Sequence, residues 1–103
     1  MKTKTLYKIS LFFILLIGTT VNAAELWVSP SGNDSNPGTE EEPLASVHMA
    51  LRKARELRRL NDPSVKDGVK IYVQDGTYYF HEPLLVRPED AGTAESPTVI
   101  LAD

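Results

Sequence analysis

The stretch LWVSPSGNDSNPGTEEEPLASVHMAL, residues 26–51, leads from a strand-like segment through a turn-rich loop into a helix-like segment. Leu26 and Val28 alternate with Trp27, a period of two that is typical of a β-strand. In residues 29–39, glycine permits a positive φ, proline presets φ, and Asn and Asp side chains bind nearby backbone amides. The spacing of the oxygen-bearing side chains does not match an EF-hand calcium loop. We therefore interpret this loop as a structural turn rather than a metal site.

An amphipathic helix is predicted after the loop, with Ser46 as its N-cap. Apolar residues recur every three or four positions and form one stripe, which is the expected packing face of the helix: Val47, Ala50, Leu51, Ala54 and Leu57. Basic residues are expected on the solvent-facing side: Arg52, Lys53, Arg55, Arg58 and Arg59. The sequence Asn61-Asp62-Pro63 is expected to end the helix.

Four short β segments are predicted downstream, at residues 69–74, 77–80, 84–87 and 98–102. The last is an apolar, β-branched run of the kind that has neighbours on both sides of a sheet. Because the sequence stops directly after it, we expect the chain to be truncated within a larger fold.

Residues 1–23 are predicted to be a secretory signal peptide. Lys2, Lys4 and Lys8 precede an uncharged apolar run, and Val21 and Ala23 suit cleavage before Ala24. A transmembrane anchor is the alternative, but the apolar run is shorter than the roughly 20 residues that a bilayer requires. The expected mature domain, residues 24–103, is therefore exported to the periplasm or surface of a bacterial cell, without a membrane association after cleavage.

The expected mature domain is acidic. It holds 8 Lys and Arg against 14 Asp and Glu, a formal charge of −6, and it has no cysteine. Binding to nucleic-acid phosphates depends on clustered Lys and Arg, so no nucleic-acid partner is expected.

No residue of the chain is predicted to be catalytic. The carboxylates Glu40, Glu41, Glu42, Asp75, Glu89 and Asp90 lie in turns or before the helix, where they act as turn formers or surface charges. His48 and His81 lack partners at metal-ligand spacing, and no phosphate loop or nucleophile motif occurs. No metal or other cofactor is therefore predicted.

Two groups of side chains are candidates for carbohydrate contacts. Trp27, Tyr78 and Tyr79 could stack on sugar rings, although packing is the commoner role of such residues, and Trp27 and Tyr72 are expected to pack under the helix. The arginine-rich helix face could bind an acidic polysaccharide, although a solvated face is the commoner interpretation.

The order of these motifs resembles the N-terminal region of secreted right-handed parallel β-helix enzymes, which are pectate-lyase-like in fold. The resemblance covers nearly all of residues 25–103 and is carried by LWVSP, GNDSNPGT, the helix, DGTYY and PEDAGT. Its closest members are glycoside hydrolases similar to families 141 and 120. It implies a mainly β fold with one capping α-helix, which covers the end of the first coils. It also implies inward positions for Ile71, Val73, Leu85 and Ile100.

The resemblance further implies a function. The chain is expected to be the N-terminal part of an exported glycoside hydrolase that degrades a polysaccharide, with two catalytic carboxylates beyond residue 103. One alternative is a lyase of the same fold, which would use Ca²⁺ and a basic residue. The other is a small exported carbohydrate-binding or structural module.

Overall fold

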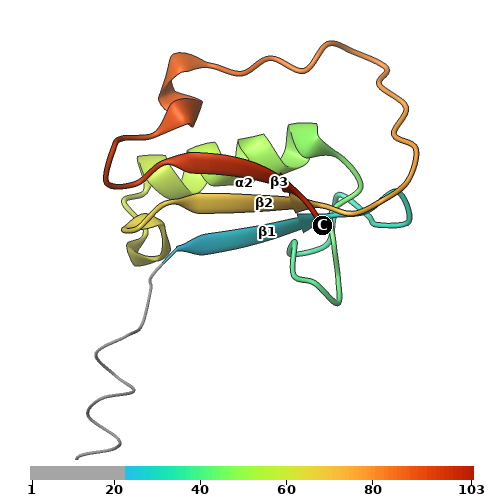
Figure 1. Cartoon of the computed structure of the whole chain (residues 1–103), viewed down its shortest axis with the longest axis horizontal. Helices are drawn as coiled ribbons and strands as arrows, with labels where there is room; N and C mark the ends of the chain where they lie inside the picture. The colour runs from blue at the N-terminus through green and yellow to red at the C-terminus, as the bar shows by residue number, and fades with distance from the viewer. Residues whose placement is uncertain (1–22) are drawn as a thin grey trace, which may run out of the picture.

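A computed structural model describes residues 23–103, so the predicted signal peptide lies outside the described residues except for Ala23. Three strands form one sheet: β1 (Ala24–Val28), β2 (Val69–Val73) and β3 (Thr98–Ala102). One helix, α2 (Val47–Arg59), and two short 3₁₀ helices, η1 (Pro63–Val65) and η2 (Pro88–Ala91), lie in the connections (Figure 1). No helix within residues 23–103 combines the length and the apolar character needed to span a bilayer.

The three strands are parallel and lie side by side in chain order. In the register, Leu26 pairs with Ile71 and Ile71 pairs with Ile100. Parallel neighbours cannot be joined by a hairpin. Each connection must therefore lead back to the end of the sheet at which the strands begin. The first return contains α2 and the second contains η2. Residues 23–103 therefore contain the expected strands at both of their ends and the expected helix between them.

The β segments predicted at residues 77–80 and 84–87 are wrong, because neither stretch is a strand. Both lie in the connection between β2 and η2, where the described residues provide no strand to pair with. Aromatic and β-branched composition reflects packing on a pleated surface rather than an intrinsic backbone preference. Without a partner strand, these residues form an extended loop (Figure 1).

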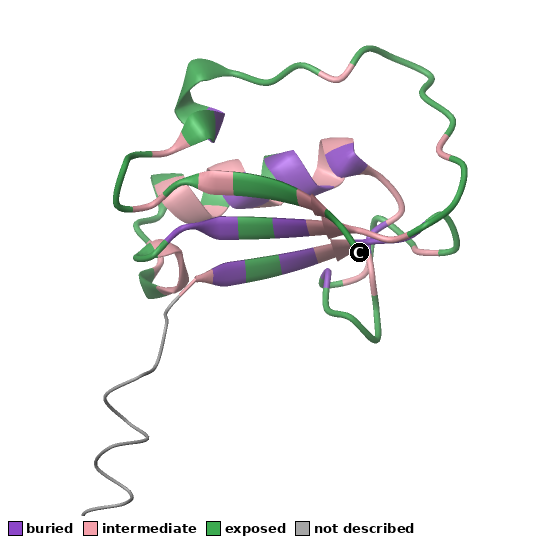
Figure 2. Ribbon diagram, in the orientation of Figure 1, coloured by how far each residue is buried: buried purple, intermediate pink, exposed green. Residues whose placement is uncertain are grey.

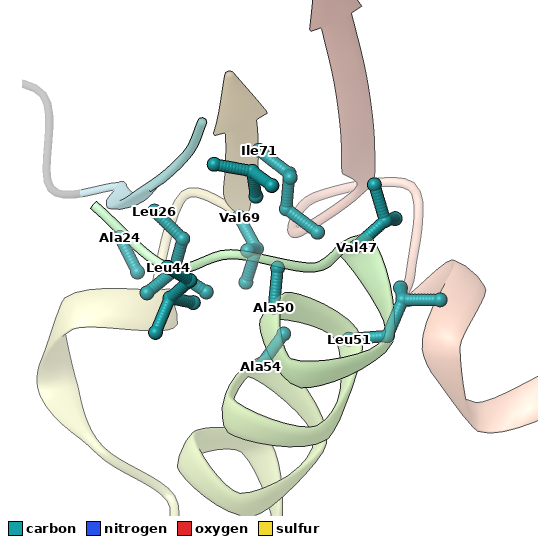
Figure 3. Close-up of a cluster of buried hydrophobic side chains, with 10 residues drawn as sticks. Ala24, Leu26, Leu44, Val47, Ala50, Leu51, Ala54, Val69 and Ile71 are labelled. Carbon is teal, nitrogen blue, oxygen red and sulfur yellow. The ribbon is translucent and has the colours of Figure 1, made fainter. Parts of the chain in front are cut away.

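The core lies between one face of the sheet and α2 (Figures 2 and 3). Alternate residues of β1 and β2 point toward the helix, and all of them are buried except Val73, which is partly buried. The intervening residues of both strands are exposed or partly buried. The helix contributes four buried residues and the partly buried Leu57. The fully enclosed aliphatic side chains contribute about 1.5–3 kcal/mol each to stability; they are Val28, Leu44, Val69 and Ile71.

The third strand is less covered than the other two. Ile100 is 48% exposed although its register partner Ile71 is fully buried. The cause is position, because α2 packs on β1 and β2. Leu85, which was expected to point inward, is 73% exposed, and its neighbour Leu84 packs against the core instead. The inward assignment of Leu85 was therefore wrong.

The turn-rich loop holds the start of α2. The Asp34 carboxylate accepts hydrogen bonds from the backbone N–H groups of Ala45 (2.9 Å) and Ser46 (3.0 Å) and from the Ser46 hydroxyl (2.9 Å). The Ser46 Oγ in turn accepts from the backbone N–H of Met49, as expected of an N-cap. At Gly32, an added Cβ would lie 2.3 Å from the Leu44 carbonyl oxygen, so the loop also needs glycine for close packing. The loop is a structural turn.

Replacing Asp34 with alanine should therefore destabilise the fold by about 1 kcal/mol, the typical effect of losing a helix cap or a hydrogen bond. The measurement is the shift of the urea unfolding midpoint at constant m-value. Glu41→Ala is the matched control, because Glu41 is an exposed acid between the loop and α2. Equal midpoints for the two variants would show that Asp34 does not anchor the helix.

Candidate functional site

The connection from β2 to η2, residues 74–87, which we call the connecting loop, arches over α2 (Figure 1). An open groove lies between this loop and the helix. Residues of both segments line it, chiefly His48, Arg52 and Arg55 from α2 and Tyr79, His81 and Arg87 from the loop. Charged and aromatic side chains from the two segments therefore border one recess.

An ion pair holds the far end of the connecting loop on α2. The Arg55 guanidinium donates two hydrogen bonds to Asp90, with 2.9 Å from Nε to Oδ1 and 2.8 Å from Nη2 to Oδ2. Asp90 is only 4% exposed and also accepts from the backbone N–H of Arg87 at 2.8 Å. Glu89 Oε1 lies 2.8 Å from Arg59 Nη2 and 3.4 Å from Arg55 Nε. The expectation that Arg55 is a solvated surface charge is therefore wrong.

The same contacts determine the protonation of this cluster. The hydrogen bonds from Arg55 hold the pKa of Asp90 below its ordinary value of 3.8, and they raise the pKa of Arg55. A general acid in glycoside hydrolysis needs a carboxyl whose pKa is raised. The pKa of Asp90 is shifted in the opposite direction, so its geometry suits a structural tether.

Arg58 also departs from the expected solvent-facing position. Its Nη1 donates to Ser96 Oγ at 2.9 Å and its Nη2 donates to Thr98 Oγ1 at 2.7 Å. The guanidinium thereby connects the last turn of α2 to the segment entering β3. Local periodicity does not reveal this role, because the partners lie about forty positions away in sequence.

The three candidate sugar-stacking residues lie in different places. Trp27 stacks on Tyr72, with ring centroids 4.3 Å apart and an interplanar angle of 17°. Both rings lie on the sheet face opposite α2, because they alternate with the buried Leu26 and Ile71. The expectation that they pack under the helix is therefore wrong. Since the two rings face each other, one face of each is already occupied.

Tyr72 and Tyr78 have hydrogen-bond partners, whereas the Tyr79 side chain is exposed to solvent. The Tyr72 hydroxyl donates to Glu25 Oε2 at 2.9 Å, and this bond is the main reason for its raised pKa. The Tyr78 hydroxyl donates to the Gln74 carbonyl oxygen at 2.7 Å, and burial raises the pKa of Tyr78. Tyr79 is 82% exposed and lines the groove. Of the three candidates, Tyr79 alone has an uncommitted ring beside a recess.

The histidines are in unequal surroundings. His48 Nε2 lies 3.2 Å from the Glu82 carbonyl oxygen, and its ring packs edge-on against Phe80 with centroids 4.9 Å apart. His81 is exposed at the groove. Within residues 23–103, no three or more His, Asp or Glu side chains converge on a point where a metal ion could bind.

Comparison with known proteins identifies the class that the parallel sheet and helix resemble. As expected from the sequence motifs, the chain is similar to pectate-lyase-like carbohydrate-active enzymes. No family model matches it.

Two relatives support this similarity. The chain is 33% identical over 82 residues to pectate lyase PEL9 of Emericella nidulans, covering 80% of this chain and 17% of that protein. It is 51% identical to a solved structure named as a glycoside hydrolase, with a TM-score of 0.75, covering 78% of this chain and 13% of that one. The chain therefore spans less than a fifth of the length of either relative.

Asp90→Asn should destabilise the fold by about 3 kcal/mol, because it leaves the largely buried Arg55 guanidinium without its counter-charge. The urea midpoint measures this loss. Glu89→Gln is the matched control and should cost about 0.5 kcal/mol, since Glu89 is solvent-exposed. A double variant with Arg55→Met and Asp90→Leu should recover most of the stability, as neutral replacement of both partners often does.

The pH dependence of stability gives a second measurement of the same pair. Because the folded-state pKa of Asp90 is lowered, its contribution is fully present above the ordinary value of 3.8 and is lost as the pH falls through the folded-state value. The Asp90→Asn variant should therefore show a flatter acid limb than the unmodified protein. Parallel acid limbs would contradict the assignment.

Proposed function

We propose that the chain is the N-terminal part of an exported glycoside hydrolase that degrades a polysaccharide. The observation that carries this proposal is the 51% identity to a solved glycoside hydrolase over 78% of the chain, at a TM-score of 0.75. Export follows from the signal-peptide pattern of residues 1–23, with the periplasm or cell surface as the destination. The charge of −6 on the mature residues favours a partner other than nucleic acid.

Within that enzyme, residues 24–103 form the cap and first coils of a right-handed parallel β-helix. Strands that stack in chain order and in register are what successive coils supply. Helix α2 covers the sheet face at β1 and β2, as a terminal cap does. Ile100 is half exposed on the same face, so a further strand beside β3 would complete its burial.

Catalysis is assigned to later coils of the full-length protein. Glycoside hydrolysis uses two carboxyl groups that flank the scissile bond, one of them with a raised pKa. Asp90 is tethered to Arg55 and Glu89 is paired with Arg59. Residues 24–103 thus act as the N-terminal cap and first coils, on which the catalytic coils stack.

A polysaccharide lyase of the same fold is the second candidate, favoured by the 33% identity to pectate lyase PEL9. Such an enzyme abstracts a proton next to a uronate carboxyl, using Ca²⁺ and a basic residue. The products distinguish the two reactions, because a lyase leaves an unsaturated uronide and a hydrolase does not.

The full-length protein should release new reducing ends from a polysaccharide without ultraviolet absorbance from unsaturated uronides, and a metal chelator should leave the rate unchanged. Residues 24–103 alone should be inactive. Absorbing products and loss of activity with chelator would identify the lyase. Turnover by residues 24–103 alone would overturn the assignment of catalysis to later coils.

Ile100→Ala tests the cap-and-coil arrangement. In residues 24–103 alone, truncating this half-exposed side chain should cost about 1 kcal/mol, whereas in the full-length protein it should cost about 2–4 kcal/mol, as for a buried site. Ile71→Ala is the matched control and should cost about 2–4 kcal/mol in both. The same small effect of Ile100→Ala in both proteins would mean that no later strand covers β3.

A further inference from the structure

The outer edge of β1 is the side of the strand that faces away from β2. Ala24 donates its backbone N–H to the Gly68 carbonyl oxygen at 3.0 Å, so the even-numbered residues of β1 bond toward β2. The intervening residues direct their backbone groups to the opposite side; they are Glu25 and Trp27, followed by Ser29 directly after the strand. No strand lies beyond this edge within residues 23–103. An edge of this kind, if left open, is a template for pairing with another chain.

Residues 38–44, which we call the edge segment, occupy this position beside the end of β1 (Figure 1). The Trp27 N–H donates to the Gly38 carbonyl oxygen, and the Trp27 carbonyl oxygen accepts from the Leu44 N–H, each at 2.8 Å. The Ser29 N–H donates to the Leu44 carbonyl oxygen, also at 2.8 Å. The edge segment therefore binds the backbone groups that a strand of another chain would need.

Three kinds of contact hold the edge segment in place. The Leu44 side chain is fully buried in the core between the sheet and α2. The Pro43 carbonyl oxygen accepts from Asn36 Nδ2 at 2.9 Å and from the Asn33 backbone N–H at 3.0 Å. Gly38 has a φ of +91°, in the left-handed region that favours glycine. All of these contacts are made within the described residues, so they do not depend on any later segment.

The two edges of the described sheet differ. At the other edge, β3 carries the exposed Val99 and Ile100, and no segment of residues 23–103 pairs with its outer side. Helix α2 packs on a face of the sheet, where it cannot supply backbone hydrogen bonds to an edge. Strands added beside β3 would extend the sheet away from β1. Covering the face and closing the edge of β1 are therefore the tasks of two different segments.

We propose that the edge segment shields β1 from a second copy of this chain and thereby leaves β3 as the edge to which strands add. The shielding goes beyond the proposed function, because its contacts lie within residues 24–103. The size of the assembly that forms without the shield does rest on the proposed function. With β3 covered by later coils, β1 can pair only with β1 of a second copy, and such a two-fold contact closes as a dimer. With β3 also open, β1 can pair with β3 head to tail and form open-ended polymers.

Sedimentation velocity of the full-length protein over a range of concentrations tests this proposal. The double variant Asn36→Ala and Gly38→Val removes the bond to Pro43 and the residue suited to the positive φ, so it should release the edge segment. We expect it to dimerise with a dissociation constant at least about tenfold lower than that of the unmodified protein. Adding Glu25→Pro should restore the monomer, because proline removes an N–H that points to the outer edge.

Asp90→Asn is the matched control, because it destabilises the fold away from the edge segment and should leave the protein monomeric. Equal association of this control would assign the effect to general destabilisation and overturn the proposal. A folded double variant that stays monomeric, or a dimer that Glu25→Pro leaves intact, would also overturn it. Asn36→Ala alone should shift the dissociation constant in the same direction, and it decides the proposal where the double variant does not fold. Polymers in place of dimers would support the shield and contradict the later coils of the proposed function.

Discussion

Burial of one face of the parallel sheet against α2 is the interaction on which the rest of the structure depends. Val69, Ile71 and Ala50 are fully enclosed at this contact (Figure 3), and Val28 is fully enclosed as well. Parallel strands cannot be joined by hairpins, so the chain must cross one face of the sheet between strands. The apolar stripe of α2 packs on the sheet along the first crossing and forms the core. The register of β1 and β2 follows, because it places the apolar residues of both strands on the side of this core.

The second crossing is held by polar contacts. The connecting loop adds few residues to the core, so its return to the sheet depends on the Arg55–Asp90 pair and on the bonds from Arg58 to Ser96 and Thr98. Both arginines project from the same helix that fills the core. Helix α2 therefore positions two successive strands by different means, through apolar burial for β2 and through charge-assisted hydrogen bonds for β3.

These two mechanisms explain what the sequence could predict. Helix α2, its N-cap and the strands at residues 69–73 and 98–102 follow from local periodicity, which directly reflects which face is buried. The Arg55–Asp90 pair joins residues 35 positions apart, and no local pattern encodes such a partner. The strands expected at residues 77–80 and 84–87 failed for the same reason, because pairing depends on distant neighbours. Tyr79 was one of three candidate sugar-stacking residues in the sequence, but its exposure and the groove beside it needed coordinates.

The free edge of β3 is an open surface of the described residues, and its chemistry suits one kind of partner. The free edge of β3 carries the exposed Val99 and Ile100, and an apolar edge strand is a template for pairing and a hazard if left open. A strand of the same protein is the partner that removes this hazard without aggregation. The apolar edge is therefore suited to permanent assembly within the chain.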